Sequence, residues 1–277
     1  MKSTKEFAPY LVSIITIVMN GVAHIEDTIR SVLSQDYPRI EYIVIDGGST
    51  DGTLEVFKKY KNRLTKTVSE PDHGIADAMN KGIRLASGEI IGIIHSDDFL
   101  EPGAVKAVVE AFASHPEADI VHGDLRFWNL EENRIYVVKP FADIQKGAIF
   151  EMPVNHSTVF IRKSIYDRYG AFDISYRLAM DYDLIVRLIG KGCTFYYLDR
   201  VLAVMRSGGM GNRHVMEGLR EVRDIAVRHG YGKMKAYVVF IYKAAERVAG
   251  NLLRKFGMRS IADIYRTLSR SRITPEG

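Results

Sequence analysis

The chain has 277 residues, of which 47% are hydrophobic and 26% are charged, as in an ordinary globular protein with one large domain and an appendage. The single cysteine, Cys193, excludes an internal disulfide framework and fits a reducing compartment such as the cytoplasm. We expect neither a signal peptide nor a transmembrane helix, because the N-terminus leads into no long apolar region and no run approaches the roughly 20 apolar residues of a membrane span.

The net charge of +4 is unevenly distributed along the chain. Residues 230–277 contain ten lysines and arginines against three acidic residues, so the tail is basic and the rest of the chain is slightly acidic. An acidic body with a basic tail argues against a nucleic-acid-binding core. Apolar residues interleave with the basic ones in the tail. This pattern leaves two interpretations open: a helical hairpin that packs on the main domain, or a peripheral contact with anionic lipid on the inner face of the plasma membrane.

The first half of the chain alternates between strand and helix patterns. Residues 12–18 are apolar and β-branched, which predicts a buried strand, and apolar residues recur with helical spacing from Ile25 to Leu33. The alternation continues with strands predicted at 41–45, 65–69, 89–94 and 119–122 and helices predicted at 54–60, 75–86 and 102–114. Strands separated by helices imply parallel pairing through right-handed crossovers. We therefore predict an α/β fold with a Rossmann-like, mostly parallel central sheet flanked by helices.

The second half has a mixed pattern. Aromatic and alternating segments lie at 125–128 and 134–138, an apolar strand is predicted at 159–161, and one clear helix is predicted near 181–189. Residues 214–270 show helical patterns with basic faces. This part of the chain is therefore predicted to end in a basic helical segment.

Asp46 stands where the predicted strand 41–45 ends, at the edge of the sheet where open α/β folds bind ligands. The Rossmann dinucleotide fingerprint and the phosphate loop ending in Gly-Lys-Ser/Thr are both absent from the turn that follows, 47–52, but its glycines let the backbone approach a ligand closely. An acid at this position can accept a hydrogen bond from a base or a ribose. A turn acid or helix cap would occupy the same position, so the pattern alone leaves both interpretations open.

A stronger signal follows the apolar strand 89–94, which ends at His95-Ser96-Asp97-Asp98. Two adjacent carboxylates repel each other unless something neutralises them, and Mg²⁺ or Mn²⁺ bound to a diphosphate would do so. The alternative is a solvated turn. The pair predicts a nucleotide-handling enzyme with a divalent metal, and the choice of ligand between Asp97 and Asp98 stays open.

The loop 70–74 precedes the predicted helix 75–86, which carries Asp77 and Lys81. Asp72, within the loop, fits a helix cap as well as a contact with a nucleotide. In the functional interpretation the loop covers the nucleotide while Asp77 and Lys81 face the site. The sequence alone does not decide between these interpretations.

Four further candidates lie in the second half of the chain. Asp181 fits the first turn of a helix, where the macrodipole favours acids, and equally a general base that takes the proton of an acceptor hydroxyl. His156 precedes an apolar strand, although a lone histidine is more often structural than catalytic. Arg206 and His214 bound a glycine-rich basic segment, which is either a loop that closes over a diphosphate or a flexible linker. We therefore expect acceptor or diphosphate contacts at His156, Arg206 and His214.

Taken in order, these motifs resemble the family 2 glycosyltransferases with the GT-A fold, in particular the bacterial enzymes that build exopolysaccharide or lipopolysaccharide. The resemblance covers most of the chain, from about Val12 to Gly211, and the ensemble is far more specific than any of its parts. The matching segments are 12–20, 29–35, 42–53, 69–82, 87–89, 96–98, 170–173 and 180–184.

The resemblance implies roles for individual residues. Thr16, Asn20 and Asp46 would hold the nucleotide base and ribose, and Asp72 would lie near the nucleotide. Asp181 matches the catalytic base of the family. The resemblance therefore assigns the donor to the first half of the chain and the base to the second.

Two positions depart from the family pattern. The D-x-D motif of the family falls on His95-Ser96-Asp97, where His95 replaces the first acid. Ser96 and Asp97 stay as donor contacts, and Asp98 could share the metal. Met180 replaces the acid that often precedes the base. The chain also lacks the Gln-x-x-Arg-Trp segment of processive synthases, which implies an enzyme that adds one sugar at a time.

The activity implied by the resemblance is an inverting transfer that depends on Mn²⁺ or Mg²⁺. The donor would be a nucleotide-sugar, a UDP-sugar above all, and the acceptor a hydroxyl group of a glycan or of a lipid-linked glycan. The implied organisation is a catalytic domain, 1–213, with a nucleotide-binding half (10–123) and an acceptor half (124–213), followed by a basic helical extension, 214–277.

Two other functions stay open from the sequence. A non-catalytic nucleotide-sugar-binding subunit would share the fold, but the retained acids Asp46, Asp97 and Asp181 argue against it. A nucleotidyltransferase that makes nucleotide-sugars usually has a glycine-rich basic loop after the first strand. Residues 18–22 contain no lysine or arginine, which argues against this second alternative.

Overall fold

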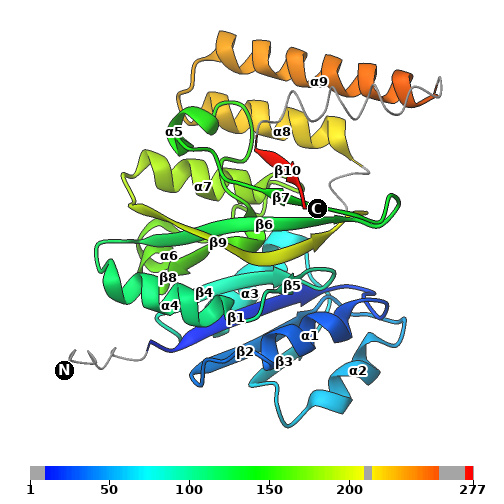
Figure 1. Cartoon of the computed structure of the whole chain (residues 1–277), viewed down its shortest axis with the longest axis vertical. Helices are drawn as coiled ribbons and strands as arrows, with labels where there is room; N and C mark the ends of the chain where they lie inside the picture. Colours follow the sequence, from blue (N-terminus) through cyan, green and yellow to red (C-terminus); the bar gives the residue numbers. More distant parts are fainter. Residues whose placement is uncertain (1–9, 209–213, 256–271, 277) are drawn as a thin grey trace.

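The computed structural model describes residues 10–208, 214–255 and 272–276, with the side chains of 251–255 outside this description. Within these residues the strands form one curled sheet with helices on both faces (Figure 1). The strands are β1 (Val12–Val18), β2 (Ile40–Asp46), β3 (Lys66–Ser69), β4 (Ile90–His95), β5 (Phe99–Leu100), β6 (Ile120–Asn129), β7 (Arg134–Val138), β8 (Phe160–Arg162), β9 (Phe195–Arg206) and β10 (Ile273–Pro275). The helices are α1 (Ile25–Leu33), α2 (Thr53–Tyr60), α3 (Ile75–Leu85), α4 (Ala104–Ser114), α5 (Ile144–Gly147), α6 (Lys163–Tyr169), α7 (Met180–Gly190), α8 (Val215–Arg228) and α9 (Lys233–Lys255), with a 3-10 turn, η1 (His156–Thr158).

Strands β3, β2, β1 and β4 lie side by side and pair in parallel, as the alternation of strands and helices predicts. All seven residues of β1 are buried, as in a central strand covered on both faces. The register aligns Val18 with Asp46 and Ile17 with His95. Strands β2 and β4 therefore end at the same edge of the sheet, which brings their acidic ends to one side of the molecule.

Beyond β4 the sheet is mixed, which corrects the expectation of a mostly parallel sheet. Strand β8 is antiparallel to β4 and β6, β7 is antiparallel to β6 and β10, and β9 runs parallel to β6. The reason lies in β6, which runs without a break through both predicted segments, 119–122 and 125–128, and returns through residues 130–133 to β7. So short a connection allows only an antiparallel pair.

Two apolar layers, one on each face of the sheet, form the core. Alternate residues of β1 divide between them: Ile14 and Val18 belong to the layer under α1, α2 and α4, and Ile15 and Ile17 to the layer under α3, α6 and α7. Because β1 packs in both layers, the neighbouring strands β2 and β4, which pair with it, end at fixed positions. The site at the sheet edge therefore rests on a packed frame.

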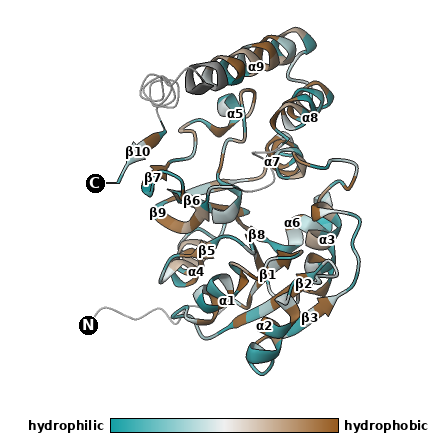
Figure 2. Cartoon of the chain, turned by 90° about the vertical axis from the view of Figure 1, so that its right-hand side faces the viewer, coloured by the Kyte–Doolittle hydropathy of each residue, from teal (hydrophilic) through white to brown (hydrophobic). Residues whose placement is uncertain are grey.

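The described part of residues 214–270 is helical as predicted, and residues 256–271 lie outside the description. Helix α8 packs on α7 through an apolar cluster that includes Ala179, Tyr182 and Ile225, and α9 lies beyond α8 at one end of the molecule (Figures 1 and 2). The last described residues return to the sheet as β10, paired with β7. None of the described helices is long and apolar enough to cross a bilayer.

Candidate active site

Asp46 ends β2 and is completely buried at the edge of the sheet. Its Oδ2 accepts hydrogen bonds from the backbone N–H groups of Gly48 (3.2 Å) and Ser49 (3.0 Å) and from the hydroxyl of Ser69 (2.6 Å). Its Oδ1 is also buried and has no partner among the described residues. A buried carboxylate oxygen without a donor is costly, so this atom is suited to accept an N–H or O–H group of a ligand. Asp46 thus stabilises its turn through Oδ2 and leaves Oδ1 for a ligand.

Asn20 braces the same turn from the end of β1. Its backbone adopts a left-handed φ of 54°, its N–H donates to Oγ of Ser49 (2.7 Å), and its Oδ1 accepts from the N–H of Thr50 (2.9 Å). Thr16, in contrast, is not brought to the site. It is fully buried, and its hydroxyl lies 3.0 Å from that of Tyr42. Because side chains alternate along a strand, Thr16 shares the side of β1 that faces a core layer.

The loop before α3 lies against the glycine-rich turn. A Cβ at Gly47 would come within 2.4 Å of the Asp72 carboxylate, so the missing side chain makes room for the loop. Asp72 accepts a hydrogen bond from the N–H of Gly74 (3.0 Å), which closes the loop ahead of the helix. The structure therefore brings Asp72 beside the turn that Asp46 holds.

Asp77 and Lys81 tie this loop to α3. Asp77 accepts from the N–H of His73 (3.0 Å), and Nζ of Lys81 donates to the carbonyl of Pro71 (3.0 Å) and pairs with Glu70 (3.0 Å). Nζ of Lys81 also lies 3.5 Å from the Asp77 carboxylate. These contacts explain both residues as structural supports of the loop, and a contact of either with a donor stays a prediction.

Asp98 is buried, whereas Asp97 is partly exposed. The side chain of Asp98 accepts from the hydroxyl of Ser157 (2.7 Å) through Oδ2, and its buried Oδ1 has no partner among the described residues. Burial, together with the charge of Asp97, raises the pKa of Asp98 to about 7. At Asp97 the backbone carbonyl accepts from Nη1 of Arg206 (3.2 Å), and the carboxylate stands at the partly exposed tip of the turn. Of the two acids, Asp97 is therefore the more accessible to a ligand.

The turn that carries these acids is anchored from two sides. The hydroxyl of Thr28, on α1, donates to the backbone carbonyls of Ser96 (2.9 Å) and Asp98 (2.6 Å). Arg206 is nearly buried and pairs with Asp27 (2.6 Å), so its charge is already engaged. Among the described residues, no group of three or more His, Cys, Asp or Glu side chains could hold a metal ion. A metal at this turn would need most of its ligands from elsewhere.

A pair of histidines stands beside the acidic turn that carries Asp97 and Asp98. The rings of His95, at the end of β4, and His156, in η1, are 5.5 Å apart and meet edge to face. Burial and the neighbouring His156 lower the pKa of His95 to about 4, and the carboxylates of Asp97 and Asp181 oppose this shift. The charges of both carboxylates therefore act on one imidazole ring. Burial also lowers the pKa of His156 to about 4, so both rings are neutral at pH 7.

Asp181 is the second residue of α7. Burial raises the pKa of its carboxyl, against the hydrogen bond that Oδ1 accepts from the N–H of Tyr182 (2.8 Å). The neighbouring acid, Asp183, is buried and contacts His229 (3.0 Å) and Arg187 (3.6 Å). Asp183 therefore ties α7 to the end of α8, and Asp181 is the acid of this helix that stays available for chemistry.

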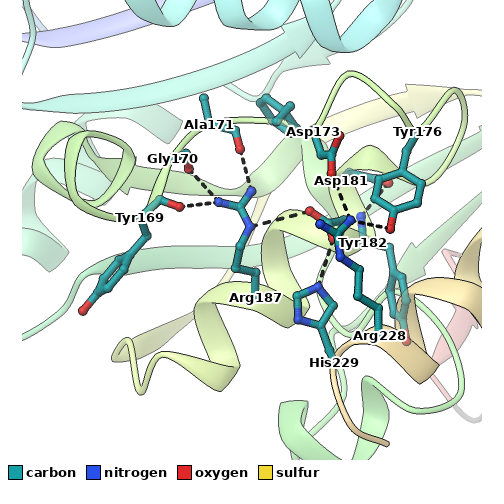
Figure 3. A network of polar contacts seen from close by, with 12 residues as sticks. Tyr169, Gly170, Ala171, Asp173, Tyr176, Asp181, Tyr182, Arg187, Arg228 and His229 are labelled. Carbon is teal, nitrogen blue, oxygen red and sulfur yellow. Dashed lines mark hydrogen bonds and ion pairs between the residues drawn. The ribbon is translucent and has the colours of Figure 1, made fainter.

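Residues of α8 that reach this region are missed by the sequence patterns. Arg228 pairs with Asp173 (3.1 Å) and donates to the hydroxyl of Tyr176 (3.0 Å) (Figure 3). Glu221 accepts from backbone N–H groups just before α7. Acidic and basic residues are ordinary on the polar face of an amphipathic helix, so nothing in the sequence marks these two.

The segment from Arg206 to His214 is described only at its ends. Its glycine-rich middle, 209–213, lies outside the described residues. His214 stands directly before α8, with Nδ1 3.3 Å from the Glu217 carboxylate. Closure of this segment over a diphosphate therefore stays a prediction.

Solved structures with the same fold are glycosyltransferases. S. aureus TarS matches with a TM-score of 0.61 at 17% identity, over 82% of this chain and 42% of TarS. A mannosyltransferase from Pyrobaculum calidifontis, in complex with GDP-Man and Mn²⁺, matches with a TM-score of 0.60 at 17% identity, over 94% of this chain and 83% of that protein. The chain spans less than half the length of TarS, and the likeness to both concerns the fold. The expected α/β GT-A fold is confirmed.

Sequence relatives point to the same family. A protein named as an uncharacterized glycosyltransferase of Mycobacterium tuberculosis is 31% identical over 227 residues, which cover 80% of this chain and 86% of the relative. A PGL/p-HBAD biosynthesis glycosyltransferase of Mycobacterium bovis is 28% identical over 72% of this chain and 78% of its own length. The model of the family Glycosyl transferase family 2 matches residues 13–172. The chain therefore belongs to glycosyl transferase family 2 and is a glycosyltransferase.

Proposed function

We propose that this glycosyltransferase moves one sugar from a UDP-sugar to a hydroxyl group of a glycan or lipid-linked acceptor in cell-surface polysaccharide synthesis, with inversion at the anomeric carbon. The observation that carries the proposal is the buried Oδ1 of Asp46, which has no partner among the described residues at the sheet edge where β4 also ends before Asp97; the charges of Asp97 and Asp181 both act on His95 there. Asp46 ends β2 at the same edge, two strand spacings or about 10 Å away. Donor-binding and proton-accepting carboxylates thus share one side of the sheet.

The nucleoside of the donor is assigned to the glycine-rich turn. The unpaired Oδ1 of Asp46 would accept an N–H of the base or an O–H of the ribose. Asn20 keeps the turn in place, and Asp72 lies beside it at Gly47. Ser96 belongs to the neighbouring acidic turn, where its backbone carbonyl accepts from Thr28. Thr16 is left out of this assignment because its hydroxyl is used in the core.

A divalent metal fits Asp97 better than Asp98. The Asp97 carboxylate is partly exposed at the strand end, whereas Asp98 is buried and already accepts a hydrogen bond from Ser157. Mg²⁺ and Mn²⁺ prefer carboxylate oxygens and commonly take one or two from the protein, with phosphate and water supplying the others. When bound, the ion would neutralise charge that develops on the diphosphate leaving group.

Asp181 is assigned as the base that takes the proton of the acceptor hydroxyl as this oxygen attacks the anomeric carbon. A single in-line displacement inverts that centre. Desolvation raises the pKa of the partly exposed Asp181 carboxyl, so it binds a proton more firmly than a fully solvated acid, which suits this role. The neutral rings of His95 and His156 lie 5.5 Å apart. We assign His156 to contact with the acceptor.

The solved neighbours support a nucleotide-sugar donor and differ in its nucleotide. TarS was determined in complexes with UDP and with UDP-GlcNAc, and the mannosyltransferase with GDP-Man and Mn²⁺. One relative is named for PGL/p-HBAD biosynthesis. A test of the proposed function must therefore compare both nucleotides.

Thermal unfolding with a panel of UDP-sugars and GDP-sugars, each with and without Mn²⁺, tests the donor. A donor that binds the folded state raises the midpoint by mass action, so we expect stabilisation by one UDP-sugar that depends on Mn²⁺. Release of nucleoside diphosphate from that donor, measured with and without glycan acceptors, tests the transfer. Stabilisation by a GDP-sugar alone would contradict the UDP assignment, and binding without release in any mixture would contradict the catalytic one.

We also propose a peripheral membrane contact through α9, because this helix turns its apolar side to the solvent. Lys243 lies on the inner side, 2.9 Å from Glu151. Met234 is 81% exposed and Ile241 62% exposed. The exposed apolar residues of α9 are Met234, Tyr237, Val238, Ile241, Tyr242 and Val248. Exposed lysines at the start of the helix, Lys233 and Lys235, complement anionic lipid headgroups.

Flotation with vesicles of phosphatidylcholine, with and without phosphatidylglycerol, tests this contact. We expect the protein to float with the anionic vesicles and Ile241→Glu to abolish flotation, because the substitution places a charge in the apolar face. Asp224→Asn, an exposed site on α8, is the control that should float normally. Undiminished flotation of Ile241→Glu would contradict the proposal, as would a lipid-independent dimer that Ile241→Glu dissociates.

A further inference from the structure

One carboxylate from α8 holds the segment that leads into α7. Oε1 of Glu221 accepts from the N–H of Arg177 (3.0 Å), and Oε2 accepts from the N–H groups of Leu178 (2.9 Å) and Ala179 (2.8 Å). Asp181 follows two residues later. Hydrogen bonds to a charged acceptor are stronger than neutral ones and are directional. Three of them on one carboxylate fix the position of this segment relative to α8.

The other contacts of α8 with this region lie on the same side of the helix. Ile225, one turn after Glu221, is fully buried in the cluster that contains Tyr182. One turn further, Arg228 holds the loop before α7, and His229 contacts a buried acid of α7 (Figure 3). Residues spaced by three or four positions share one helix face, so α8 presents an apolar contact flanked by polar ones.

We propose that Glu221 is a positioning residue for the base: it fixes the start of α7 so that the Asp181 carboxylate meets the acceptor hydroxyl. The inference rests on the role proposed above for Asp181. Packing of α8 on α7 is already provided by Ile225, whereas the three N–H bonds to Glu221 add a directional constraint that apolar packing lacks. Helix α8 is then a support of the active site and not merely an appendage.

Glu221 also acts on Asp181 through its charge. Burial raises the pKa of Asp181, the N–H of Tyr182 and the ring of His95 lower it, and the negative charge of Glu221 raises it. Removal of that charge therefore lowers the pKa of Asp181, and the acid limb of the kcat profile moves to lower pH. A residue that only stabilised the fold would leave the limb where it is.

The test measures kcat and the donor KM of Glu221→Gln and Glu221→Ala across the acidic and neutral pH range, in the full chain. We expect Glu221→Ala to lower kcat by roughly 10–100-fold, the cost of a misplaced catalytic group, with the donor KM unchanged. Both variants should shift the acid limb to lower pH. Asp224→Asn is the matched control, since this exposed acid on the same helix pairs with the adjacent Arg223; it should retain wild-type kinetics.

Backbone hydrogen exchange by mass spectrometry gives a readout that does not need turnover. Residues 177–182 should exchange faster in Glu221→Ala than in the wild type and in Asp224→Asn. Faster exchange with an unchanged kcat and an unshifted acid limb would overturn the proposal, and so would unchanged exchange. A wild-type protein that transfers no sugar would overturn the proposed function instead, which the exchange experiment separates from the role of Glu221 in holding α7. Glu221→Gln, which keeps one acceptor oxygen, guards against a variant that fails to fold.

Discussion

Two parts of this enzyme, the turn at Asp46 that we assign to the donor and the segment before α7 that we assign to the acceptor side, are held by hydrogen bonds between residues at different separations along the chain. Asp46 receives its hydrogen bonds from residues 2, 3 and 23 positions away. On the acceptor side, Ala179 depends on Glu221, 42 positions away, and Arg126 binds Glu276, 150 positions away. The turn at Asp46 is thus closed by neighbouring strands and turns, whereas the acidic turn of Asp97 also depends on a distant residue, because Arg206 donates to its backbone carbonyl. The acceptor side is complete only when the end of the chain has folded onto it.

This difference predicts that the two halves can be disturbed separately. The turn at Asp46 follows β2, which pairs with the fully buried β1. The register of this pair aligns Asp46 with Val18. The position of Asp181 depends on side chains from another helix. Substitutions on the acceptor side should therefore change turnover and leave donor binding intact, and substitutions at the donor turn should do the reverse.

The largest effect is expected at the base. Asp181→Asn keeps the size of the side chain and an oxygen for the N–H of Tyr182, but it removes the proton acceptor. We expect kcat to fall by about 10²–10⁴-fold, the usual contribution of a general base. Donor affinity, measured by calorimetry with the UDP-sugar and Mn²⁺, should stay within error of the wild-type value, and release of UDP reports the turnover.

Asp46→Asn tests the opposite case, in which donor affinity falls and turnover at saturating donor is largely kept. The substitution weakens the acceptor that we assign to the nucleoside, so donor affinity should fall while saturating donor restores much of kcat. If Asp181→Asn lost donor affinity and turnover in equal measure, the two halves would not be separable and the division drawn here would fail.

The contrast between the halves also explains what could be predicted from the sequence. Asp46 and Asp97 follow apolar strands, and strand ends share an edge by a general rule, so their placement was foreseeable. The burial of Thr16 against Tyr42 could not be foreseen, because a strand with apolar residues on both sides shows no polar face from which side-chain orientation could be inferred. Strand β9 of the second half was not predicted either, because Asp199 and Arg200 interrupt its apolar pattern.

Glu221 marks the limit of such prediction. Its function depends on which helix face packs against α7, and an acid at position 221 of an amphipathic helix looks like any solvated residue. The proposed preference for Asp97 over Asp98 likewise rests on burial and on the Ser157 contact, which no local sequence pattern shows. Both proposals therefore depend on tertiary packing.

A further prediction concerns the stability of the part of the chain that we assign to the donor. Glu41 is buried and accepts hydrogen bonds from Ser13 (2.5 Å), Lys66 (2.8 Å) and Ser87 (2.8 Å). Burial alone would raise the pKa of Glu41, but these hydrogen bonds prevail and lower it to about 2, from 4.5 in the unfolded chain. The ionised network therefore contributes fully above pH 4.5, and about 3 kcal/mol is lost as the pH falls toward 2.

Urea unfolding of the wild type and Glu41→Gln over this pH range measures that contribution. The difference in unfolding free energy should be largest near pH 7 and should shrink as the pH falls below 4.5, because a protonated Glu41 resembles glutamine. Glu55→Gln, at an exposed pair with Lys58, is the control and should differ little from the wild type at any pH. A difference for Glu41→Gln that stayed constant with pH would contradict the lowered pKa.

The smallest effect is expected where the chain end joins the acceptor half. Glu276 forms a two-point ion pair with Arg126 (2.6 and 2.7 Å), which fastens β10 to the sheet. Its side chain is 38% exposed, and Arg126 keeps Glu101 as a second partner. Glu276→Gln should therefore lower the unfolding free energy by only about 0.5–1 kcal/mol in urea, and high salt should reduce this difference further. A loss of several kcal/mol would mean that β10 is as integral to the sheet as β1, and that chain separation along the sequence does not set how firmly a segment is held.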